Sequence, residues 1–420
     1  MNEALFQFIW KHRLFDAQSL KTTSQQAISI LHTGNLNTNA GPDFLEAKIK
    51  IDQTTWAGNV ELHLKASDWK KHHHVGNKNY EKIILHVVFE NDLELNLDCP
   101  TLELKKNIDA SLIKNYASLM QNNYFIPCEK LIEKVPVISK MQQLDKALLE
   151  RLMQKSQSIN ELLILYKNSW QDVFYILLAQ SFGLKINSFP FETLAKRIPL
   201  KLFSKHKNNL LQIEALLFGT AGFLTDDFND VYYQTLKKEF DYLKSIYKIE
   251  PLEKHQWLFM RLRPNNFPTI RLAQFAQLIF QSEHLFSKII SLHNVKDVFS
   301  LFQFSINDFW RTHYTFSEKE SKPTTKKMGN TFISLLIINT IIPTLFVYGK
   351  SIGDKTICDK AIHWLEEMPA EKNTIIEKYK LLDVDIKTAY DSQAILELKK
   401  NYCSKKNCLN CVIGFRLLKN

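Results

Sequence analysis

Glycine and proline are scarce in this chain, with 11 and 12 among 420 residues. Small β-barrels and propellers turn every few residues and need many of both, so their scarcity favours long helices. The six cysteines are sparse until the C-terminus, which excludes the dense disulfide framework of a small secreted domain. The Walker loop, the dinucleotide fingerprint and the nucleophile elbow are also missing.

Long uninterrupted apolar stretches are missing too. Residues 332–348 are the one apolar run that resembles a membrane span, but the run contains Pro343 and is shorter than the roughly 20 residues that a span needs. We therefore expect a buried core helix broken near Pro343. The N-terminus carries charges throughout and lacks the apolar centre of a signal peptide. These features predict a cytoplasmic protein without a membrane partner.

Apolar and basic residues are plentiful instead. Apolar residues make up 45% of the chain, enough for a proper core, and the formal net charge is +10. Lysines and arginines release counterions when they contact phosphates, which makes nucleic acid a plausible partner. The alternative interpretation is that surface lysines only keep the protein soluble.

The periodicity of apolar residues predicts an α+β fold. After an N-terminal helix, alternation with period two predicts strands at 44–51 and 56–65. A continuous apolar, β-branched run predicts a central strand at 83–89, and a shorter pair is expected at 93–97 and 102–104. From residue 108 the period becomes helical, with strong segments at 173–182, 213–218, 232–247, 257–262 and 270–280. We expect a small mixed-sheet α/β domain at 1–125, an α-helical domain at 126–400 and a cysteine-containing tail at 401–420.

The sharpest chemical signal lies in the first predicted hairpin. Asp43 directly precedes one strand, and Glu61, His63 and Lys65 alternate along one face of the next. Two carboxylates that converge at a strand end suit a hard cation such as Mg²⁺, which polarises a phosphodiester and lowers the pKa of a bound water. A basic neighbour, His63 or Lys65, would position that water or stabilise developing charge.

Strand pairing decides whether the two acids can meet. Antiparallel counting from a turn at residues 52–55 places Asp43 on the face opposite Glu61. A bulge, or a turn at Pro42, must shift the parity by one residue to bring them together. The alternative interpretation is an ordinary solvated strand face with Asp43 as a turn residue.

The segments Pro42-Asp43 and Glu61-x-His63, joined by a hairpin, resemble the PD-(D/E)xK nuclease superfamily. The resemblance implies a core of helix, three-stranded meander, helix and strand, and cleavage of nucleic acid with Mg²⁺ or Mn²⁺. It assigns cation binding to Asp43 and Glu61 and makes Glu3, in the first helix, a further candidate ligand. The superfamily pattern has lysine where this chain has His63, so Lys65 is the alternative basic group.

The whole chain also resembles DUF2851, a family of uncharacterised bacterial proteins. The resemblance rests on residues 39–44, 56–63, 67–69, 84–88, 126–128 and 261–268, and on the C-terminal cysteines. It implies family membership and leaves the activity open.

Histidines gather in the N-terminal part, at His63, His72, His73, His74 and His86. With Asp43, Glu61 and Asp68 they could form the site of a zinc-dependent hydrolase, because imidazole suits zinc. Their spacing matches no established metal motif. The alternative interpretation is a solvated histidine-rich loop and one core histidine, His86.

The C-terminal cysteines Cys403, Cys408 and Cys411 follow the spacing C-x₄-C-x₂-C. Three thiolates this close can hold a zinc ion or an iron–sulfur cluster with a fourth ligand from elsewhere. We expect Cys128 as that ligand, with Cys358 and His363 as alternatives. Some nucleases of the superfamily named above join distant cysteines in this way, so the resemblance also favours Cys128. The alternative interpretation is unliganded thiols in a reducing cytoplasm.

In the helical part, Arg261, Arg263 and Arg271 flank a proline-bounded loop. They could clamp a phosphate of bound nucleic acid, or they could cap helices and pair with acids. Taken together, the sequence favours a metal-dependent phosphodiesterase or nuclease. A non-catalytic nucleic-acid-binding or scaffolding protein with the same fold is one alternative, and a zinc-dependent hydrolase is another.

Overall fold

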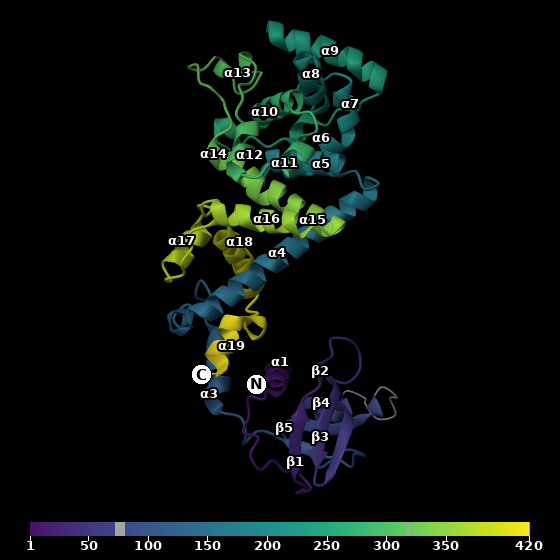
Figure 1. The fold of residues 1–420 in the computed structure, drawn as a ribbon, viewed down its shortest axis with the longest axis vertical. Coiled ribbons are helices and arrows are strands. Elements are labelled where there is room, and N and C mark those ends of the chain that lie inside the picture. Colours follow the sequence, from purple (N-terminus) through teal and green to yellow (C-terminus); the bar gives the residue numbers. More distant parts are fainter. Residues whose placement is uncertain (72–79, 317–319, 420) are drawn as a thin grey trace. The chain divides into compact units, whose positions relative to one another are not determined.

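The computed structural model describes residues 1–71, 80–316 and 320–419 (Figure 1). The chain divides into two compact units. The first unit combines residues 1–145 with residues 397–420, and the second unit is residues 146–396. The first unit contains the sheet and the second is helical, so the predicted α+β class is confirmed.

A small mixed sheet forms the centre of the first unit. Its strands are β1 (Ile28–His32), β2 (Asn35–Leu36), β3 (Phe44–Ile51), β4 (Thr54–Lys65), β5 (Ile83–Glu90) and β6 (Thr101–Glu103). The strand order is β1-β3-β4-β5-β6, and β2 pairs with the start of β3. The pairs β1–β3 and β3–β4 are antiparallel, whereas β4–β5 and β5–β6 are parallel.

A β-bulge interrupts the hairpin of β3 and β4. Ala47 pairs with Gly58, but Phe44 pairs with Val60, so β3 carries one residue more than β4 over this stretch. Glu46, inside the extra stretch, has a φ of 60°. The bulge shifts the strand parity by one residue and brings Asp43 level with Glu61.

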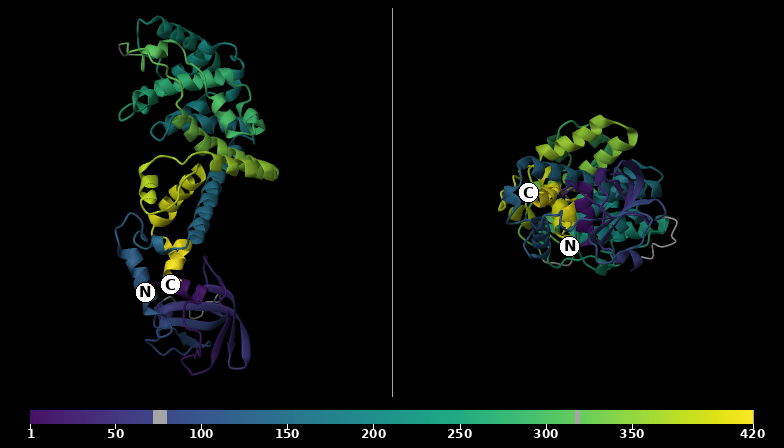
Figure 2. Two further views of the ribbon diagram at one scale, coloured as in Figure 1. Left: turned by 60° about the vertical axis from the view of Figure 1, so that its left-hand side comes forward. Right: turned by 90° about the horizontal axis from the view of Figure 1, so that it is seen from below.

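The first unit also contains the α-helices α1 (Glu3–His12), α2 (Asp68–Lys71), α3 (Ala110–Gln121) and, from the C-terminal segment, α19 (Val412–Lys419). Of these, α1 and α2 pack against the sheet. Asn2 caps α1 by accepting a hydrogen bond from the backbone of Leu5. The apolar face of α1 is buried, and α1 packs against β4 and β2. α19 lies beside α3 (Figures 1 and 2).

The predicted strands at 44–51, 56–65 and 83–89 are present as β3, β4 and β5. The alternation of Leu and polar residues at 93–97 was misleading, because this segment is not a strand and Leu93 is exposed. β1 and β2 were not predicted. Both are short edge strands with more exposed than buried residues. Their apolar and polar residues therefore do not alternate clearly enough to predict a strand.

The helical region begins with α4 (Val137–Leu165), a helix that contains the boundary between the two units. The further helices of the second unit are α5 (Trp170–Phe182), α6 (Ser188–Arg197), α7 (Leu200–Ser204), α8 (Leu210–Thr220), α9 (Val231–Tyr247), α10 (Pro268–Gln281), α11 (Leu285–Ser291), α12 (Val295–Leu301), α13 (Phe309–Thr312), α14 (Asn330–Leu336), α15 (Ile342–Ile352), α16 (Lys355–Glu367), α17 (Thr374–Lys380) and α18 (Ala389–Glu397). Neighbours in sequence pack as pairs, notably α5 with α6, α8 with α9 and α15 with α16.

Most of the helical segments that we predicted are present, and one is wrong. Residues 257–262 form turns after a short 3₁₀ helix, Lys254–Gln256. Arg261 there has a φ of 65°, which an α-helix does not allow.

The apolar run becomes a continuous helix of three parts: α14, a π-helical stretch (Ile337–Ile341) and α15. Residues 330–352 are long and apolar enough to cross a membrane, but 72% of their most apolar window is buried inside the protein. That burial is typical of a core helix. The irregular hydrogen bonding falls just before Pro343, as expected from its missing N–H.

Candidate metal and acid–base site

The two acids of the hairpin interlock through backbone amides. Glu61 Oε2 accepts a hydrogen bond from the Asp43 amide over 3.1 Å, and Asp43 Oδ2 accepts one from the Leu62 amide over 2.9 Å. Each carboxylate is therefore held by the strand that carries the other. The bulge in β3 supplies the parity shift that this contact needs.

Helix α1 adds two polar side chains to the same place. The Gln7 amide group donates a hydrogen bond to Asp43 Oδ1 over 2.7 Å. Glu3, one helical turn earlier, is close enough to raise the pKa of Glu61 by repulsion. The structure thus brings Asp43 and Glu61 together, with the exposed side chain of Glu3 within electrostatic range of Glu61.

Burial and like charges dominate the electrostatics of Glu61. Its side chain is almost fully buried, and burial is the largest cause that raises its pKa to about 8. Repulsion from Asp43 and Glu3 raises the pKa further, while the hydrogen bond from the Asp43 amide lowers it. At neutral pH such a carboxyl group holds its proton, and a bound cation would replace that proton.

Two buried histidines, His63 and His86, lie next to the acids. His63 Nε2 lies 3.8 Å from Glu61 Oε1, and His63 Nδ1 lies 3.0 Å from His86 Nε2. His86 Nδ1 in turn lies 3.5 Å from the hydroxyl of Thr101. Trp69 packs edge-on against both imidazole rings. These contacts form a chain from a carboxyl group through two imidazoles, which is an arrangement that can hold or move a proton.

The structure separates Lys65 from this group. Its side chain is exposed, and its charge acts on Asp92, whose pKa it helps to lower. His63 is therefore the basic group beside the acids. His72, His73 and His74, which the zinc-hydrolase alternative needs, lie outside the described residues.

Two residues of the site, Gln7 and Tyr80, were missed from the sequence alone. Gln7 could have been found, because it follows Glu3 by four residues in a predicted helix and so shares its face. Tyr80 lies near the acids, since Asp43 and Glu61 both raise its pKa after burial does. His86 was named either as one histidine of a possible zinc site or as a core residue, and its contact with His63 depends on the parallel pairing of β4 with β5.

Across the described ranges, no three His, Cys, Asp or Glu side chains form a group that could hold a metal ion by themselves. Asp43 and Glu61 offer a pair of carboxylates, which is the number that Mg²⁺ commonly takes from a protein while it keeps water and substrate oxygens as its other ligands. The donor set of the pair therefore fits a hydrated Mg²⁺ or Mn²⁺.

The four-cysteine group, by which we mean Cys128, Cys403, Cys408 and Cys411, lies within the first unit. Burial is the main cause that raises the pKa of Cys128 far above its usual value, and the other three thiols raise it further. The same two causes raise the pKa of Cys408 to about 12. Cys358 and His363, the alternative ligands, belong to the second unit.

Lysines anchor the C-terminal segment beside Cys128. The ammonium of Lys399 donates to the carbonyl of Phe125 over 2.6 Å, and that of Lys406 donates to the carbonyl of Asn122 over 2.9 Å. Both carbonyls belong to the segment that leads into Cys128. The contacts explain how thiols 275 residues apart in sequence come close.

The three arginines of the helical region do not form one cluster. Arg261 and Arg263 are exposed, but Arg271 is buried in α10. Its guanidinium donates to Gln274 over 2.7 Å and to Asn266 over 2.5 Å, and it stacks 3.4 Å from the ring of Phe332. Burial lowers the pKa of Arg271 to about 9. Arg271 therefore supports the core.

Comparison with known proteins gives one match. A family model described as a protein of unknown function, DUF2851, matches residues 3–374. No curated protein matches the chain, and no solved structure does.

Proposed function

The chain belongs to the DUF2851 family, and we propose that its first unit hydrolyses phosphodiester bonds of nucleic acid with Mg²⁺ or Mn²⁺. The observation that carries the proposal is the meeting of Asp43 and Glu61 beside His63, in a place where burial and repulsion hold the pKa of Glu61 at about 8. A divalent cation relieves that repulsion, so the pair is suited to bind one.

Asp43 and Glu61 would hold the cation, and Glu3 would add an acidic group at its edge. When bound, the cation supplies Lewis-acid chemistry to the phosphodiester and lowers the pKa of a bound water. Gln7 keeps the Asp43 carboxylate oriented through its hydrogen bond to Oδ1. The rigid backbone contacts of both acids hold the pair before any ligand arrives.

His63 would take the proton of the attacking water or return one to the leaving oxygen. Its Nε2 faces Glu61, and its Nδ1 contacts His86. His86 is thus a positioning residue that fixes the ring of His63 and its tautomer.

The sequence pattern and charge support the same proposal. Pro42-Asp43, the hairpin and Glu61-x-His63 resemble the PD-(D/E)xK superfamily, with His63 in place of its lysine. The net charge of +10 suits a polyanionic substrate.

The four-cysteine group is the second part of the proposal. Four thiols from two distant segments, three of them buried, are the soft ligands that zinc or an iron–sulfur cluster prefers. As placed, no three of these described thiols form a ready-made metal group, so a bound metal would have to draw them together. Such a site would fasten the C-terminal segment to Cys128. It would be structural, because the acids and His63 already contain the groups that hydrolysis needs.

The test of the hydrolysis compares two site variants with a matched control. The purified full-length protein is incubated with supercoiled DNA and with single-stranded RNA, with Mg²⁺, Mn²⁺, Zn²⁺ or a chelator. Asp43→Asn and Glu61→Gln should each lower the rate of cleavage by at least about 100-fold, because each removes a cation ligand. Glu94→Gln changes an exposed carboxylate of the same unit and should leave the rate unchanged.

Other outcomes would overturn the proposal. Cleavage that survives in Asp43→Asn would exclude this site. Binding of nucleic acid without cleavage under all conditions would favour the non-catalytic alternative. Cleavage supported by Zn²⁺ and not by Mg²⁺ or Mn²⁺ would favour the zinc-dependent hydrolase.

A further inference from the structure

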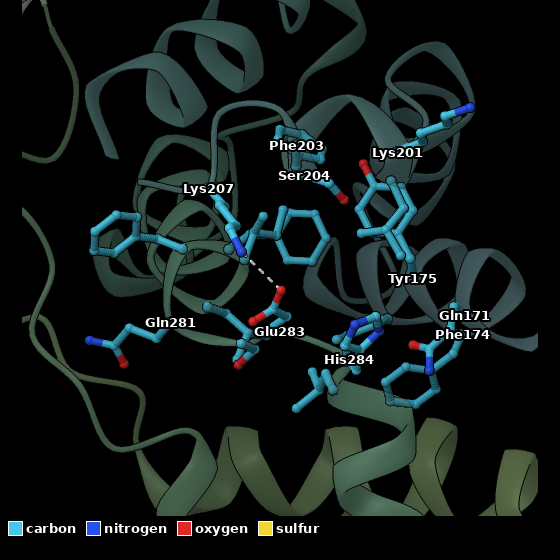
Figure 3. Close-up of a pocket in the computed structure, with 18 of the residues that line it drawn as sticks. Gln171, Phe174, Tyr175, Lys201, Phe203, Ser204, Lys207, Gln281, Glu283 and His284 are labelled. Carbon is cyan, nitrogen blue, oxygen red and sulfur yellow. Dashed lines mark hydrogen bonds and ion pairs between the residues drawn. The ribbon is translucent and has the colours of Figure 1, made fainter. Parts of the chain in front are cut away.

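The second unit contains a cavity of about 680 Å³ between α5, α7, α10 and the start of α11 (Figure 3). This volume lies within the range of roughly 300–1,000 Å³ that is typical of small-molecule sites. The cavity is far in sequence from the acids and histidines of the first unit, and the proposed hydrolysis does not use it.

Aromatic side chains line the inner part of the cavity. Phe174 and Tyr175 come from α5, Phe203 from α7 and Phe275 from α10. The ring of Tyr175 is stacked at 5.7 Å on that of Phe275 and is edge-on at 6.0 Å to that of Phe203. The Tyr175 hydroxyl already donates to the carbonyl of Ile198, so this residue offers the cavity its ring. All four aromatic residues are at most 5% exposed, so the inner wall is apolar and closely packed.

Positive charge exceeds negative charge at the mouth. Lys207 forms an ion pair of 3.1 Å with Glu283 across the cavity (Figure 3). Lys288 and His284 also lie close enough to Glu283 to lower its pKa, after the larger effect of Lys207. One carboxylate thus faces two lysines and a histidine. The other acid of the lining, Asp172, is engaged with Ser169 at the start of α5.

Amide side chains complete the lining. Gln171, Asn208 and Gln281 come from three different segments around the cavity, and the Gln171 amide already donates to the hydroxyl of Ser287 over 2.8 Å. Amides donate and accept hydrogen bonds in the plane of a ring, as the edges of nucleobases require. A saturated acyl chain offers no hydrogen-bonding groups to such amides, so it matches this lining less well than a nucleobase.

We propose that this cavity binds a nucleoside monophosphate, with the base against the aromatic wall and the phosphate at the mouth beside Lys207 and Lys288. Base stacking on aromatic rings is worth about 1–3 kcal/mol per base. The phosphate would compete with Glu283 for Lys207, so the ion pair that now spans the cavity would open. This inference goes beyond the hydrolysis proposed above and does not depend on it.

The test titrates each of the four ribonucleoside 5′-monophosphates into the full-length protein by calorimetry, with the matching nucleosides and oleate as comparison ligands. We expect a Kd below about 1 mM for at least one nucleotide. Lys207→Glu and Lys288→Glu should each weaken nucleotide binding at least about tenfold and leave nucleoside binding nearly unchanged, because only the phosphate meets the lysines. Phe203→Leu keeps an apolar side chain but removes a ring, and it should weaken binding of nucleotide and nucleoside alike.

Lys296→Glu is the matched control, because Lys296 is an exposed lysine of α12 that does not line the cavity. It should leave the Kd unchanged. The proposal is overturned if no nucleotide binds at 5 mM, if Lys296→Glu weakens binding as much as Lys207→Glu, or if oleate binds and the nucleotides do not.

Discussion

Two buried glutamates illustrate how the same residue type gives different chemistry. Glu61 lies among Asp43, Glu3 and His63, so its raised pKa reflects charged neighbours as well as burial. Glu214, in α8, is buried in the second unit, where Tyr232 and Asn307 hydrogen-bond its carboxyl group and lower the pKa that burial raises to about 7. Only Glu61 has the neighbours that a cation site needs.

Glu214 should make the stability of the second unit depend on pH. Below pH 4.5 the carboxyl group is protonated in the folded and the unfolded chain. Between pH 4.5 and about 7 only the unfolded chain releases the proton, so the free energy of unfolding falls as the pH rises. The loss should be on the order of 3 kcal/mol.

The variant Glu214→Gln cannot ionise at this position, so its stability lacks this pH dependence. Urea unfolding of both proteins at several pH values measures the difference in their free energies of unfolding. The free energy of unfolding of the original protein should fall relative to that of the variant between pH 4.5 and 7.5, while other titrating groups cancel in the difference. A constant difference across this range would mean that Glu214 ionises normally.

The elements show which features local sequence can specify. Strands β3, β4 and β5 were predicted, because their apolar residues alternate or run continuously and turn residues separate them. The meeting of Asp43 and Glu61 could be stated only as a condition, because a bulge depends on the partner strand as well as on local residues. The contact of His63 with His86 requires the pairing of β4 with β5, which periodicity does not report.

Close packing of α8 on α9 rests on one glycine. A Cβ atom added to Gly219 would lie 2.0 Å from Cγ of Phe240, a buried residue of α9. Gly219→Ala should therefore lower the free energy of unfolding of the second unit by about 1–3 kcal/mol, despite the better helix propensity of alanine. Gly329→Ala is the control, because no atom lies within 4 Å of its added Cβ. Equal stability of the two variants would show that α8 and α9 are farther apart.

At the scale of the whole molecule, the C-terminal segment belongs to the unit that the N-terminus begins. Residues 397–420 contribute α19 and three of the four grouped cysteines to the first unit. The sequence favoured Cys128 as the partner of these cysteines, and the structure places its thiol near theirs. The sequence could not show which backbone carbonyls accept hydrogen bonds from Lys399 and Lys406. Those contacts join segments more than 270 residues apart.

If the four-cysteine group holds a metal, its loss should affect one unit. Elemental analysis and the absorption spectrum of the purified protein should show zinc or an iron–sulfur cluster. Cys403→Ser should lower the metal content and the melting temperature of the first unit, because a ligand to a structural metal is lost. The transition of the second unit should not move.

Cys358→Ser is the matched control, since Cys358 is a partly exposed thiol of the second unit. It should keep the metal content of the original protein. Full occupancy in Cys403→Ser, or no metal in the original protein, would contradict the proposed site.

The discontinuous first unit imposes an order on maturation in the cell. Domains generally fold as units while the chain emerges from the ribosome. Residues 146–396 have all been synthesised before residues 397–420. The second unit can therefore complete its folding while the first unit still lacks α19. Until then the surfaces of Cys128 and α3 that the C-terminal segment will cover stay open to water and to chaperones, and the first unit is complete only after residues 397–420 have been made.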